Sequence, residues 1–169
     1  MTCTANCKPF DPVLNRAIIY LASRVCPQGW DASPDAPGTL EEVDQYTSKY
    51  GKICVWDGDY GDSFLCDREA DLAFAAWHDW HHHVGCLTFD RAGETEAWRR
   101  HVVDLERLTG ESAQVSPRMA AWAGILYARL VGQFDYRDVW GCDPDFTKGF
   151  SQHYYRDPLG AISDPKYRT

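Results

Sequence analysis

The sequence predicts a mainly helical fold, a small bundle of about four helices with a short β-hairpin insert and an irregular, aromatic C-terminal tail. Apolar residues recur at three-to-four spacing in several segments, helix-starting residues stand directly before these segments, and glycine and proline punctuate the stretches between them. The 169 residues fit one domain, with an N-terminal extension at 1–10, a helical core at 11–141 and the tail at 142–169.

The first part of the chain predicts two helices and a loop. Asp11-Pro12 is typical of a helix start, because a capping side chain is followed by proline at the first helical position, and a helix is expected over about 12–26. Residues 27–38 are rich in Pro and Gly and predict a loop. A short helix should follow from Thr39, where two glutamates suit the positive end of the helix dipole.

Residues 52–66 show a strand-like pattern. Ile53 and Val55 alternate with other residues, and Phe64 follows after an Asp- and Gly-rich stretch. This arrangement predicts two short strands joined by a turn, which is the β-hairpin insert.

The later part of the chain predicts the helices that carry the chemistry. Asp67 suits the cap of a helix that ends at Gly85, and a loop should follow over 86–93. A further helix is expected from Glu94 to about Leu108, forming an antiparallel hairpin with the one before it. Ser116-Pro117 predicts the start of a last helix, which reaches about Phe134.

The most informative motif is the run His78-Asp79-Trp80-His81-His82-His83. His78 and His82 are four residues apart, so their side chains leave one helix face roughly 5–6 Å from each other and can converge on one metal ion. The segment H-D-x-x-H resembles the H-E-x-x-H zinc-peptidase motif, with Asp79 in the place of the glutamate that serves there as general base. A solvated or aromatic-packed histidine face is the alternative interpretation.

A metal site needs a third ligand, and the predicted hairpin nominates Glu94, which opens the helix after the loop and lies near His82. His101 lies two turns further along the same face, and either Asp79 or His101 is expected to move protons. The residues expected to line the site are Gln133 and Tyr136. Zn²⁺ is the expected ion, with Fe and Mn as alternatives.

Three segments together resemble a pattern found in uncharacterised bacteriophage and prophage proteins: H-D-x-x-H at 78–82, F-D-x-x-G-E at 89–94 and G-Q-x-x-Y at 132–136. The resemblance covers about residues 70–150 and implies no established activity. It implies that the G-E element stands beside the H-D element, which pairs Glu94 with the two histidines. An acidic residue expected before Gly132 is replaced by Ala128-Arg129-Leu130, which favours a mononuclear over a dinuclear site.

Composition limits the partners. The formal net charge of −8, with 17 basic and 25 acidic residues, lacks the basic excess of a general nucleic-acid binder. No apolar run predicts a membrane span or a secretory leader, so a cytoplasmic or virion-associated protein is expected. Seven cysteines without a C-x-x-C pair are expected to be mainly buried thiols, with a metal or disulfide cluster as the alternative.

Two functions remain open from the sequence. In the first, the protein is a metal-dependent hydrolase in which an open metal position carries water. In the second, it is a phage structural or accessory protein in which the same residues lock the fold, and the aromatic tail mediates self-association or contact with other phage proteins.

Overall fold

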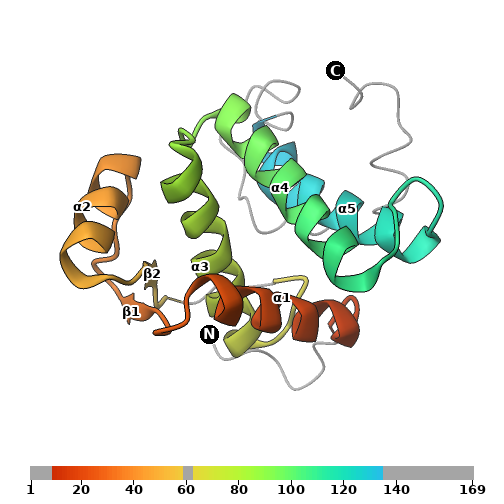
Figure 1. Ribbon diagram of the computed structural model, residues 1–169, viewed down its shortest axis with the longest axis horizontal. Helices are drawn as coiled ribbons and strands as arrows, with labels where there is room; N and C mark the ends of the chain where they lie inside the picture. Colours follow the sequence, from red (N-terminus) through yellow and green to blue (C-terminus); the bar gives the residue numbers. More distant parts are fainter. Residues whose placement is uncertain (1–8, 59–62, 135–169) are drawn as a thin grey trace. The chain divides into compact units, whose positions relative to one another are not determined.

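The computed structural model describes residues 9–58 and 63–134, and its helices confirm the mainly helical fold. The elements in chain order are α1 (Pro12–Val25), β1 (Asp31–Ser33), α2 (Leu40–Tyr50), β2 (Cys54–Trp56), α3 (Arg68–Gly85), α4 (Arg91–Thr109) and α5 (Pro117–Leu130) (Figure 1). The chain divides into two compact units, Met1–Gly93 and Glu94–Thr169, which are described one at a time. The predicted tail and Tyr136 lie outside the described residues.

The core of the first unit forms where α1 crosses α3 (Figure 1). As the sequence predicts, α1 begins at Pro12, because the Asp11 carboxylate accepts a hydrogen bond from the amide of Val13 at 2.8 Å. The large side chains of Leu14, Ile18 and Trp77 are fully buried. Burying each side chain of this size stabilises the fold by roughly 1.5–3 kcal/mol, so this core fixes the position of α3 within the unit.

The predicted β-hairpin at 52–66 is wrong. The strand β2 pairs with β1 in parallel, with Asp31 opposite Cys54 and Ser33 opposite Trp56, and Phe64 lies in a turn. Parallel strands need a crossover connection, which here is α2. The physical reason for the error is that β1 is only three residues long within a loop-like sequence, so its pairing with β2 leaves no periodic signal.

The helix that carries the histidine run, α3, and the helix that follows it, α4, both begin at capping aspartates. At the start of α3 the Asp67 side chain accepts from the amides of Glu69 and Ala70, as predicted. The predicted loop at 86–93 is too long, because α4 begins at Arg91 rather than Glu94. The Asp90 carboxylate accepts from the amide of Gly93 at 2.9 Å and so caps the helix three residues before the predicted start at Glu94.

The second unit contains most of α4 and all of α5. The indole of Trp98 on α4 donates a hydrogen bond to the Ala123 carbonyl of α5 at 2.8 Å, and its ring meets Tyr127 edge to face. Ser116 caps α5 at the predicted position by accepting from the amide of Met119. None of the helices in the described ranges is long and apolar enough to cross a membrane.

Candidate metal centre

Three side chains with metal-ligating atoms come together at the end of α3 and the start of α4. One ligand atom from each of His78, His82 and Glu94 lies within 4.8 Å of the others. In zinc sites, imidazole nitrogens and carboxylate oxygens lie roughly 2.0–2.2 Å from the ion, so these three atoms would move closer together on binding one. We call these three residues the His/Glu group, and this group can hold a metal ion.

His82 is the most constrained member of the His/Glu group. Its side chain is fully buried, and its Nδ1 lies 2.9 Å from the backbone carbonyl of Leu87. A carbonyl can only accept, so this contact assigns a proton to Nδ1, and in the neutral ring the lone pair is then on Nε2. A histidine that ligates a metal through one nitrogen typically donates its other N–H to a carbonyl or carboxylate in this way.

His78 is half-buried one turn before His82 on α3, and the two imidazole centroids are 4.5 Å apart. The ring of Phe74 stacks against His78 with 6.0 Å between centroids and 17° between planes. Phe89 stacks against His82 with 4.3 Å between centroids and 29° between planes. Each imidazole therefore has one phenyl ring stacked against it, which restricts its rotation and lowers the local polarity.

Glu94 lies in the first turn of α4 and is buried, with 5% of its surface exposed. A carboxylate at this end of a helix is favoured by the positive pole of the helix dipole. Glu96, two residues later, instead interacts with Arg99 and Arg100 on the helix surface. Of the two glutamates, only Glu94 therefore belongs to the His/Glu group.

The two residues predicted to move protons do not belong to the His/Glu group. Burial raises the pKa of the Cys26 thiol to about 11, and the charge of Asp79 adds to this rise. This interaction places Asp79 near Cys26, which belongs to the core cluster of the first unit. His101 is fully buried on α4, with its Nδ1 directed at the carbonyl of Ala97. A role for Asp79 or His101 in proton transfer stays a prediction.

The remaining histidines of the run have partners elsewhere. His81 is buried against the rings of Trp77 and Trp80. His83 Nδ1 lies 2.6 Å from a carboxylate oxygen of Asp44, which joins α3 to α2. Neither residue belongs to the His/Glu group found within the described ranges.

Gln133, predicted to line the site, donates its side-chain amide to the Leu130 carbonyl at 2.8 Å. This contact is local to the end of α5. A lining role for Gln133 is therefore still only a prediction.

Sequence reasoning missed the residues of the turn between α3 and α4. The Leu87 carbonyl and the Phe89 ring both contact His82, and Asp90 caps α4. The capping aspartate was the available signal, since Asp stands three residues before Gly93 and directly before a helical pattern. A contact made by a backbone carbonyl leaves no pattern in the sequence, so no signal could have identified Leu87.

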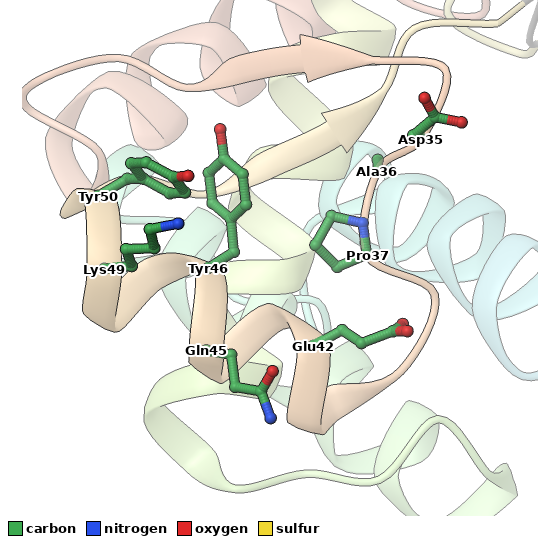
Figure 2. A pocket seen from close by; sticks show the side chains of 8 residues that line it. All are labelled: Asp35, Ala36, Pro37, Glu42, Gln45, Tyr46, Lys49 and Tyr50. Carbon is green, nitrogen blue, oxygen red and sulfur yellow. The ribbon is translucent and has the colours of Figure 1, made fainter.

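A separate cavity of about 370 Å³ lies on α2 and the loop before it. Figure 2 shows the ring of Tyr46 rising from α2 toward the strands, with Pro37 beside it on the loop. The Tyr46 hydroxyl donates to Asp31 at 2.8 Å, and the Lys52 ammonium donates to the same carboxylate at 3.1 Å. We call Asp31, Tyr46 and Lys52 the Asp31 cluster. The cavity contains no residue predicted to belong to the metal site.

Comparison with known proteins finds no match to this chain among protein-family models, curated proteins or solved structures.

Proposed function

We propose that the protein binds a divalent metal ion through His78, His82 and Glu94, and that Zn²⁺ is the ion. The observation that carries the proposal is the convergence of the three ligand atoms within 4.8 Å. Two imidazoles with one carboxylate form a ligand set used by zinc enzymes, and imidazole also suits Fe and other transition metals. The phage-type pattern supports the same set, because its G-E element stands beside its H-D element.

A hydrolytic activity is the first extension of this proposal. Zinc held by three protein ligands supplies a Lewis acid and an open position for water. In this proposal Leu87 and the two phenyl rings orient the imidazoles, and Asp79 or His101 accepts a proton from the reacting water. A pocket that admits substrate beside the ion is a requirement of this function.

A non-catalytic phage structural or accessory protein is the second candidate, and one specific observation favours it. The side chains of His82 and Glu94 are 0% and 5% exposed, respectively. A metal enclosed to this extent stabilises the fold, as structural zinc does, and a full protein shell would leave no position for substrate.

Elemental analysis of the purified full-length protein tests metal binding. We expect one equivalent of metal in the wild type and its loss in the His78→Ala/His82→Ala double variant. Equal, sub-stoichiometric metal in both proteins would contradict the proposal.

X-ray absorption spectroscopy of the metal-loaded protein then separates the two candidates. A shell of three protein ligands and one water oxygen favours the hydrolase. A shell made entirely of protein ligands favours the structural role.

A further inference from the structure

The turn that follows α3, residues 86–90, is joined to His82 by two hydrogen bonds from a single residue. Leu87 donates its amide to the His82 carbonyl at 3.0 Å and accepts from the His82 imidazole at 2.9 Å. Cys86 makes this reversal with a left-handed backbone, at φ 49°, directly after the last residue of α3. The imidazole is therefore fixed to the turn as well as to its own helix.

Phe89 adds a second restraint from the same turn. Its ring lies over the His82 imidazole with 4.3 Å between centroids, while 36% of its own surface remains exposed. This ring contact restrains the imidazole from outside its own helix.

Gly93 allows the turn to close against α4. A Cβ atom at this position would lie 1.8 Å from the Thr88 carbonyl oxygen and 2.7 Å from the Thr88 carbonyl carbon. Both are backbone atoms, so no side-chain rotation relieves the clash. Only glycine permits this approach, and the next residue in the chain is Glu94.

We propose that Gly93 and Phe89 are positioning residues of the metal site, which set its affinity by holding the turn that orients His82 immediately before Glu94. The inference rests on the proposed function, since it assigns these residues to a metal bound by the His/Glu group. It goes beyond that function by identifying groups that do not themselves ligate the ion. Partners behind a metal ligand commonly account for roughly 10–100-fold in metal affinity.

The test measures zinc affinity by competition with a chromogenic chelator in the full-length protein. We expect Gly93→Ala to weaken binding on the order of 10–100-fold, and Phe89→Ala to weaken it by a smaller factor. Gly38→Ala is the matched control, because a Cβ there meets nothing closer than 3.9 Å and the backbone is not left-handed. Tyr20→Ala, which removes an aromatic ring that is 50% exposed on α1, is the control for Phe89.

A second readout separates positioning from general stability. Nitrogen NMR of histidine-labelled, metal-free protein should show His82 protonated at Nδ1 in the wild type and a mixture of tautomers in Phe89→Ala. The melting temperature of metal-free Phe89→Ala should stay close to the wild type, while the rise on adding zinc becomes smaller.

The outcomes are distinguishable. If the wild type binds no metal, the proposed function fails. If the wild type binds metal and the folded Gly93→Ala and Phe89→Ala variants bind it equally well, the positioning inference fails and the proposed function stands. If Gly93→Ala does not fold, Phe89→Ala alone decides, and unchanged affinity together with an unchanged His82 tautomer overturns the inference.

Discussion

The Asp31 cluster and the His/Glu group are two clusters of polar side chains that differ in their balance of hydrogen-bond donors and acceptors. In the Asp31 cluster one carboxylate accepts hydrogen bonds from two donors, the Tyr46 hydroxyl and the Lys52 ammonium. In the His/Glu group each of the three side chains can present a lone pair toward the other two. The first arrangement is complete with protein atoms alone.

In the second arrangement a shared proton or a metal ion can join these lone pairs. A proton can join only two of the three lone pairs, whereas a divalent ion can join all three. Metal binding would then displace protons from the group, as it does at other histidine sites. The balance of donors and acceptors among neighbouring groups, rather than the number of groups, therefore distinguishes a structural cluster from a candidate binding site.

Of the substitutions that test this difference between the two clusters, the largest effect on zinc affinity is expected from a change at Glu94. Glu94→Gln keeps the shape of the side chain but removes the charge, so zinc affinity should fall by more than the roughly 10–100-fold typical of losing a group behind a ligand. Glu96→Gln is the control, since Glu96 interacts with surface arginines. Titration calorimetry measures both, and equal affinities in the two variants would remove Glu94 from the site.

The three members of the His/Glu group were predictable from the sequence, whereas the Asp31 cluster was not predicted. The four-residue spacing of His78 and His82 specifies a shared helix face whatever the surroundings are, and Asp67 marks where that helix begins. Glu94 required one further assumption, that a helix follows a short loop. These predictions depend on local geometry, which the sequence encodes directly.

The predictions that were wrong depend on contacts between segments distant in sequence, or on contacts made by backbone atoms. The parallel pairing of β1 with β2 depends on a crossover through α2, and three-residue strands carry no periodic pattern. The loop predicted over 86–93 includes Gly93, yet Gly93 lies inside α4, where the Thr88 carbonyl excludes any side chain.

An intermediate effect is expected from the cap of α2, the helix that carries Tyr46. Thr39 accepts from the amide of Glu42, and the Glu42 carboxylate accepts in return from the Thr39 amide. Thr39→Ala should lower the free energy of unfolding by about 1 kcal/mol, measured by urea denaturation. Zinc affinity should not change. A parallel loss of metal binding would show that α2 and the His/Glu group are coupled and would break the comparison.

The smallest effect is expected from the charge of Asp31, because the cluster is partly exposed to solvent. Hydrogen bonds from Tyr46 and then Lys52 lower the pKa of Asp31 below its ordinary value of 3.8. A lowered pKa in the folded state means that the stabilisation is present above pH 3.8 and is lost as the pH falls through the folded-state value. Asp31→Asn should therefore destabilise the protein slightly at pH 7 and should remove part of its sensitivity to acid below about pH 4. Urea midpoints measured across this range, with Asp35→Asn as the control, test the prediction, and an acid dependence identical to the wild type would show that the Asp31 carboxylate is not selectively stabilised in the folded state.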